Sequence, residues 1–89
     1  MNKARQYGKQ YAKRMFQDLF KYPSYRGKYF TWASFPGQVA CMAETNVFTA
    51  YAQPISRSLE AVAANAAYDT AAELVVKFNL ASSRDVTII

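Results

Sequence analysis

The chain has 89 residues, of which 52% are hydrophobic and 16% aromatic, and its formal net charge is +5. This length suits a single domain, and the hydrophobic content excludes a disordered chain. The sequence contains one cysteine and no histidine, which excludes a disulfide scaffold and removes the commonest general base and metal ligand. No apolar run approaches the roughly 20 residues that span a bilayer, so we expect no membrane segment.

The positive charge is concentrated at the beginning of the chain. Eight of the eleven basic residues lie within residues 1–28, where Asp18 is the one acid, whereas residues 29–89 carry a small net negative charge. This asymmetry predicts an anionic partner for the first part of the chain. The alternative is a solvated helix face that is basic for no functional reason. Residues 1–16 are also similar to a mitochondrial presequence, because they are basic, amphipathic and free of acids, which leaves mitochondrial targeting open.

Residues 3–21 have the periodicity of an amphipathic helix. At about 100° per residue, one broad side of this helix is apolar, and it is formed by Ala4, Tyr7, Tyr11, Ala12, Met15, Phe16 and Leu19. The opposite side is polar and basic, and it is formed by Lys3, Gln6, Gln10, Lys13, Arg14, Gln17 and Lys21. Gly8 either weakens this helix by up to about 1 kcal/mol or permits the close approach of another element.

Three short strands are expected between the helices. The stretch "KYPSYRG" ends the first helix, because Pro23 disfavours helical backbone at the residue before it. The expected strands span residues 28–34, 38–43 and 47–52, and the turns "FPG" and "ETN" separate them. Connections this short predict an antiparallel meander. In the second strand Val39, Cys41 and Ala43 share a face, so we interpret Cys41 as a small core residue and not as a nucleophile.

Residues 58–78 predict a second long helix, with Glu60 in its first turn and Asn79 at its end. Its apolar stripe follows spacings of three and four residues through Leu59, Val62, Ala63, Ala66, Thr70, Leu74 and Phe78. Its many alanines permit close packing against the large rings elsewhere in the chain. The order of elements predicts an α+β fold, α-β-β-β-α, with two helices on one face of a three-stranded antiparallel sheet. Residues 1–80 form one domain in this interpretation, and residues 81–89 form a tail that either folds back or binds a partner.

Three local patterns accompany this order of elements. They are carried by Pro23-Ser24-Tyr25, by Phe35, Val39 and Cys41, and by the pair Ala66-Ala67 within residues 65–69. Together, over about residues 5–78, they resemble the double-stranded RNA-binding domain family, which has a P-x-Y motif before its first strand and an alanine pair in its closing helix. Two RNA-contact elements of that family are degenerate here. The "G-P-x-H" element is absent, and "ISRSLEA" stands where the family has "K-K-x-x-K".

The resemblance implies non-enzymatic binding of double-stranded or structured RNA, with little sequence preference, within a larger assembly. Phosphate contacts would come from the basic first helix and from the beginning of the second. The candidate nucleic-acid-binding residues are Lys9, Gln10, Lys13, Arg14, Gln17 and Arg57.

No arrangement of residues predicts an enzyme. The six acids are scattered, the pair Asp69 and Glu73 fits a solvated helix face, and three glycines form no phosphate-binding loop. We therefore expect no catalytic residue, metal, cofactor or small-molecule substrate. The alternative function is a protein–protein interaction module, an adaptor or a small inhibitor, that docks through exposed rings or the "DVTII" tail. The single cysteine favours an intracellular location, cytoplasmic unless the N-terminus is a presequence.

Overall fold

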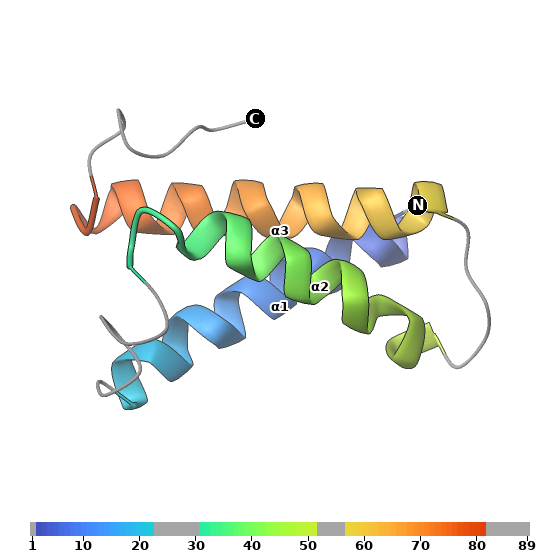
Figure 1. Cartoon of the computed structure of the whole chain (residues 1–89), viewed down its shortest axis with the longest axis horizontal. Coiled ribbons are helices and arrows are strands. Elements are labelled where there is room, and N and C mark those ends of the chain that lie inside the picture. Colours follow the sequence, from blue (N-terminus) through green and yellow to red (C-terminus); the bar gives the residue numbers. More distant parts are fainter. Residues whose placement is uncertain (1, 23–30, 52–56, 82–89) are drawn as a thin grey trace.

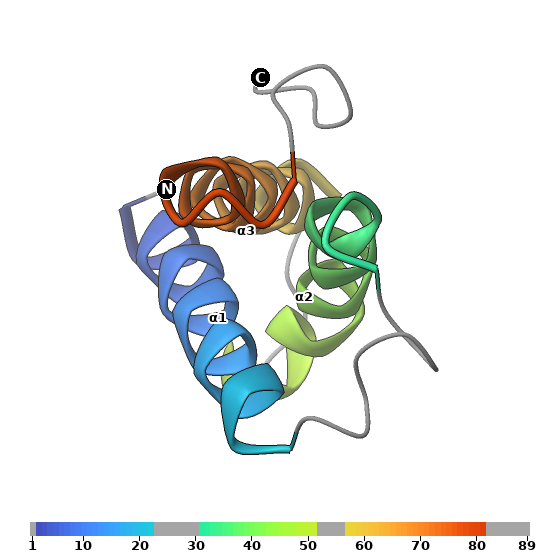
Figure 2. The same cartoon turned by 90° about the vertical axis from the view of Figure 1, so that its left-hand side faces the viewer.

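In the part of the chain that the structure describes, three helices follow one another in alternating directions (Figure 1). In this computed structural model, residues 2–22, 31–51 and 57–81 are described. Helix α1 spans Asn2–Lys21, α2 spans Phe35–Tyr51 and α3 spans Arg57–Lys77. Seen from one end, the three helices lie at the corners of a triangle (Figure 2). The first and last helices that the sequence predicts are therefore confirmed to within a residue at each end.

The predicted α-β-β-β-α order is wrong, because the described residues contain no strand. The second predicted strand and most of the third lie within α2, and residues 31–34 form a turn that leads into it. Residues 28–30 and 52 lie outside the described part of the chain. The fold is thus a helical bundle, and the sheet that the resemblance to double-stranded RNA-binding domains implies is missing from the described residues.

Helix α2 is explained by an apolar stripe with a spacing of four residues. Phe35, Val39, Ala43 and Val47 are fully buried, and this spacing places them on one side of a helix. Cys41, which the strand interpretation places beside Val39 and Ala43, is instead an exposed free thiol. Its placement in the core was therefore wrong, because a residue two positions from Val39 lies on the other side of a helix.

The beginning of α2 carries a reciprocal cap that the strand interpretation missed. The Ser34 backbone N–H donates to Thr31 Oγ1 at 3.1 Å, and the Thr31 backbone N–H donates to Ser34 Oγ at 3.1 Å. This is the geometry of a capping box, with serine in the position usually taken by glutamate. Pro36 follows as the second residue of α2, where a helix tolerates a missing N–H. The "FPG" stretch therefore begins a helix and does not form a turn between strands.

Helix α3 packs against both other helices, and more extensively than those two pack against each other. Its contact sides are made of small residues, since Ala63, Ala64, Ala66, Ala67, Ala71 and Ala72 are all buried. Gly8 of α1 lies directly against the α3 backbone. A Cβ atom built on Gly8 would overlap the Ala63 carbonyl oxygen and approach the Ala67 nitrogen to 3.0 Å. The prediction that Gly8 permits close approach of another element is confirmed, and we call this contact the small-residue seam (Gly8, Ala63 and Ala67).

The end of α3 is fixed by a Schellman motif. Leu80 N–H donates to the Val75 carbonyl at 2.9 Å and Asn79 N–H donates to the Val76 carbonyl at 3.1 Å, while Asn79 has a φ of 56°. This is the left-handed position that such a motif requires, and asparagine tolerates it better than most residues. The predicted stop at Asn79 is confirmed. Phe78, the last residue of the predicted apolar stripe, follows the end of α3 and is 54% exposed.

Candidate nucleic-acid interface

The polar side of α1 is exposed along its length, as the sequence predicts. The five candidate contact residues that lie on α1 are all exposed: Lys9, Gln10, Lys13, Arg14 and Gln17. We call these five residues the basic face. Lys9, Lys13 and Gln17 follow one another at intervals of four residues, so they form a single row along the helix. An extended anion lying along α1 would meet these side chains in sequence.

Arg57, the sixth candidate, is the first residue of α3. It lies at the end of the bundle where α1 also begins, because Ala4 of α1 packs with Ala63 of α3. Its side chain lies outside what the structure describes. The contact between Arg57 and an anion on the basic face therefore stays a prediction.

On the side of α1 that faces α2, two tyrosines adjoin the basic face. Tyr7, Gln10, Tyr11 and Arg14 line a small pocket of about 110 Å³. The rings of Tyr7 and Tyr11 are 5.8 Å apart, and Asn46 Nδ2 of α2 donates to the Tyr11 hydroxyl at 3.4 Å. Burial raises the pKa of both tyrosines above the usual value of 10.0, so both hydroxyls stay neutral at physiological pH. Arg14 thus lies beside neutral hydrogen-bonding groups, and none of the four lining residues is acidic.

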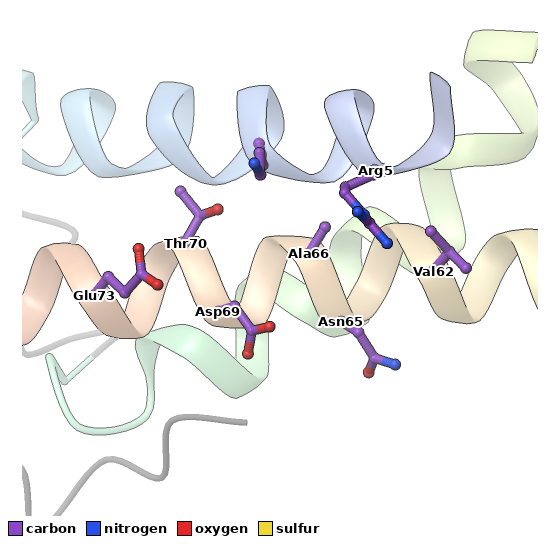
Figure 3. A pocket seen from close by; sticks show the side chains of 8 residues that line it. Arg5, Val62, Asn65, Ala66, Asp69, Thr70 and Glu73 are labelled. Atoms are coloured by element: carbon purple, nitrogen blue, oxygen red, sulfur yellow. The ribbon is translucent and has the colours of Figure 1, made fainter. Parts of the chain in front are cut away.

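On the side of α1 that faces α3, the basic face meets acidic residues. A groove of about 400 Å³ separates Arg5 and Lys9 of α1 from Asp69 and Glu73 of α3. Figure 3 shows Arg5 reaching from α1 towards α3 and Thr70 projecting from α3 towards α1. The opposed charges of this groove lower its attraction for a phosphate relative to the middle of the basic face. We therefore centre the candidate interface on Lys13 and Arg14 rather than on Arg5.

Asp69, predicted to lie on a solvated helix face, has one carboxylate oxygen that is buried. Its Oδ1 atom is buried and accepts no hydrogen bond within the described part of the chain. Because a buried carboxylate oxygen without a donor is unfavourable, this wall of the groove attracts positively charged groups. Lys9 and Arg5 supply such groups from the opposite wall.

A group of aromatic residues at one end of the bundle was missed by the site prediction. The aromatic end consists of Phe16, Phe20, Trp32, Phe35 and Phe78. The Phe16 ring lies at its centre, 5.1 Å from the Phe20 ring and 5.6 Å from the Phe78 ring. Phe20 is 47% exposed and Phe78 is 54% exposed. In the sequence, "FKY" and "KF" pair these rings with lysines, which is the one signal that distinguishes them from core phenylalanines.

No known protein family, curated protein or solved structure matches this chain. Among the described residues, no helix combines the length and the apolar character needed to cross a membrane.

Proposed function

We propose that this chain is a non-enzymatic RNA-binding module that holds the phosphate backbone of double-stranded or structured RNA on the basic face of α1. The observation that carries the proposal is the exposure of all five predicted contact residues along a single helix. Lysine and arginine supply charge to phosphates, and glutamine supplies hydrogen bonds to phosphate and sugar oxygens. Such contacts fix the position of the chain on RNA without reading its sequence.

The corrected fold alters the reason for the proposal. A double-stranded RNA-binding domain spans two minor grooves through three separate elements, and the described residues form a different architecture. What supports binding here is the charge on α1, which is independent of the presence of a sheet. A helix of this kind contacts phosphates one after another along its length, and its few cations favour action within a larger assembly.

The strength of this interaction depends steeply on salt. If Lys9, Lys13 and Arg14 each neutralise one phosphate, the affinity falls about 40-fold between about 50 and 200 mM salt. A protein-interaction module that docks through exposed rings, the alternative that the sequence leaves open, would show little of this dependence. Salt dependence therefore separates the two functions before any variant is made.

A mobility shift with duplex RNA, duplex DNA and single-stranded RNA tests the proposal. We expect the double charge reversal Lys13→Glu/Arg14→Glu to abolish RNA binding at about 50 mM salt, because four units of charge change at the centre of the interface. An unchanged affinity of that variant for RNA would contradict the proposal.

A matched pair of neutral variants tests whether position matters beyond total charge. Lys13→Gln/Arg14→Gln and Lys3→Gln/Arg5→Gln each remove two positive charges from α1. We expect the first pair to weaken RNA binding more than the second, since Arg5 faces the acidic wall of the α3 groove. Equal losses would mean that α1 acts through its total charge and that Lys13 and Arg14 have no special place.

We also propose an intracellular location. The support is the exposed thiol of Cys41, which would be prone to oxidation outside a reducing compartment. Cytoplasmic and mitochondrial locations both satisfy this argument.

A further inference from the structure

The aromatic end combines buried rings at its centre with rings that are about half exposed to solvent. Phe16 is 7% exposed and Phe35 is fully buried, so these two rings anchor the cluster in the core. Phe20 and Phe78 pack against Phe16 at ring distances of 5.1 and 5.6 Å, yet about half of each side chain stays accessible. The core holds both rings in place, and the Phe20 ring also packs against the Trp32 ring at a centroid distance of 5.7 Å, while the accessible half of each side chain offers a surface to a flat ligand.

A lysine adjoins each accessible ring in the chain. Lys21 follows Phe20, and its Nζ lies over the exposed Tyr22 ring, 5.5 Å from the ring centre; Lys77 precedes Phe78, and its Nζ lies over that ring, 5.8 Å from its centre. Asp18 is the one acid of α1, and it lies on the opposite side of that helix from Phe20, since two residues turn an α-helix by about 200°. The lysines thus give this end the charge that a polyanion requires.

The aromatic end also continues the row of the basic face. Along α1, Lys9, Lys13, Gln17 and Phe20 follow one another at intervals of four, four and three residues. All four therefore lie along one side of the helix. From Lys9 to Phe20 the helix rises about 17 Å. One strand of a nucleic acid held at Lys9 and Lys13 would therefore reach Phe20 if it continued along α1.

We propose that the aromatic end binds unpaired bases of the nucleic acid whose phosphates lie on the basic face. One base stacks on the Phe20 ring and another on the Phe78 ring, while Lys21 and Lys77 contact the adjoining phosphates. Stacking of bases on aromatic side chains beside cations is how proteins hold single strands with little sequence preference. This proposal rests on the proposed function and adds to it that the preferred ligand is structured RNA with an unpaired segment.

The experiment compares three ligands that share the same duplex. The first is a blunt RNA duplex, the second carries an unpaired extension about six nucleotides long, and the third carries an extension of equal length without bases. We expect the extension with bases to raise the affinity at least about fivefold, the effect of stacking one base, and the abasic extension to raise it much less. Both extensions carry the same phosphates, so the difference between them measures stacking alone.

Two ring variants and one control assign the effect to the aromatic end. Phe20→Leu and Phe78→Leu keep an apolar side chain in contact with Phe16 but remove the flat ring, and together they should abolish the gain from the extension. Tyr68→Leu makes the same kind of change at a half-buried position of α3, about 15 Å along the helix from Phe78, and should leave the gain intact. Circular dichroism and thermal melting establish that each variant stays folded.

The outcomes separate this proposal from the proposed function. If the wild-type chain binds blunt, extended and abasic ligands equally, the stacking proposal is wrong while phosphate binding stands, and a protein is then the better partner for the aromatic end. If the ring variants weaken binding to all three ligands equally, the rings act through the fold and the proposal is again overturned. If no RNA binds at about 50 mM salt, the proposed function fails and the stacking proposal fails with it.

Discussion

The small-residue seam and the aromatic end solve two different packing problems within one bundle. At the seam, Gly8 lies against the backbone of Ala63 and Ala67, so the helices are as close as their main chains allow. At the aromatic end, where α1 diverges from α3 (Figure 1), large rings fill the space between the helices, and Phe20 and Phe78 stay half exposed. The seam has no surface to offer a partner and tolerates little added volume. The aromatic end exposes ring surface to solvent and tolerates changes in volume, which is why we place a binding function there.

The largest effect is expected at Gly8. Gly8→Ala should destabilise the fold by about 2 kcal/mol or more, because the new Cβ would overlap the main chain of α3, which cannot move aside as a side chain can. This loss occurs although alanine favours a helix over glycine by about 1 kcal/mol. Denaturation by urea measures the change in the free energy of unfolding.

Gly37 provides the matched control for this substitution. It is also helical, but a Cβ atom built on it has nothing within 4 Å among the described residues. Gly37→Ala should therefore stabilise the chain by about 0.5–1 kcal/mol. If both glycines accept alanine with a gain, the close approach of α1 and α3 is wrong.

A second pair of substitutions tests the difference in tolerance. Ala67→Val adds volume to a fully buried position of the seam and should cost about 1–3 kcal/mol. Phe78→Leu removes one ring contact at a half-exposed position and should cost about 1 kcal/mol or less. Thermal melting of the two variants ranks them, and a greater loss for Phe78→Leu would reverse our assignment of the seam as the rigid region.

A third prediction concerns the left-handed residue that ends α3 next to Phe78. Asn79→Ala should destabilise the chain by about 1 kcal/mol, since an alanine is strained at a φ of 56°. Asn79→Gly should be neutral or slightly stabilising, because glycine takes this conformation without strain. Both variants lose the asparagine amide, so the difference between their free energies of unfolding measures the strain of alanine in the left-handed conformation. Equal values would show that the left-handed backbone at position 79 carries no strain for alanine.

The sequence predicts α1 and α3 correctly because their apolar residues recur at helical spacing over five turns or more, a signal too long to be accidental. It mispredicts α2 because two patterns overlap there. Val39, Cys41 and Ala43 alternate as in a strand, while Phe35, Val39, Ala43 and Val47 recur at four as in a helix. The longer pattern is the real one, and Pro36-Gly37, which usually marks a turn, concealed it because proline is also favourable in the first turn of a helix.

The candidate site also has one part that the sequence predicts and one part that it does not. The basic face is predicted residue by residue because long charged side chains are exposed whatever the neighbouring element is. The aromatic end is missed because exposure of a phenylalanine depends on tertiary packing. Phe16 and Phe78 both lie in apolar helical stretches, yet one is 7% and the other 54% exposed. The lysine beside Phe78 is the one local signal that separates them, and the arrangement of the three helices is needed to interpret it.

The smallest effect is expected on the side of α1 that faces α2, where Tyr7 and Tyr11 lie and Asn46 of α2 donates to the Tyr11 hydroxyl. Burial raises the pKa of Tyr7 and Tyr11 above 10.0, so the folded state holds these protons more tightly than the unfolded chain. Their contribution to stability is complete below pH 10 and falls as the pH rises through the folded-state values. The free energy of unfolding should therefore decline more steeply above pH 10 in the wild-type chain than in Tyr7→Phe/Tyr11→Phe. Asn46 donates to the Tyr11 hydroxyl and opposes the effect of burial there without reversing it, so a decline that is equally steep in the wild-type chain and in the double variant would contradict this assignment.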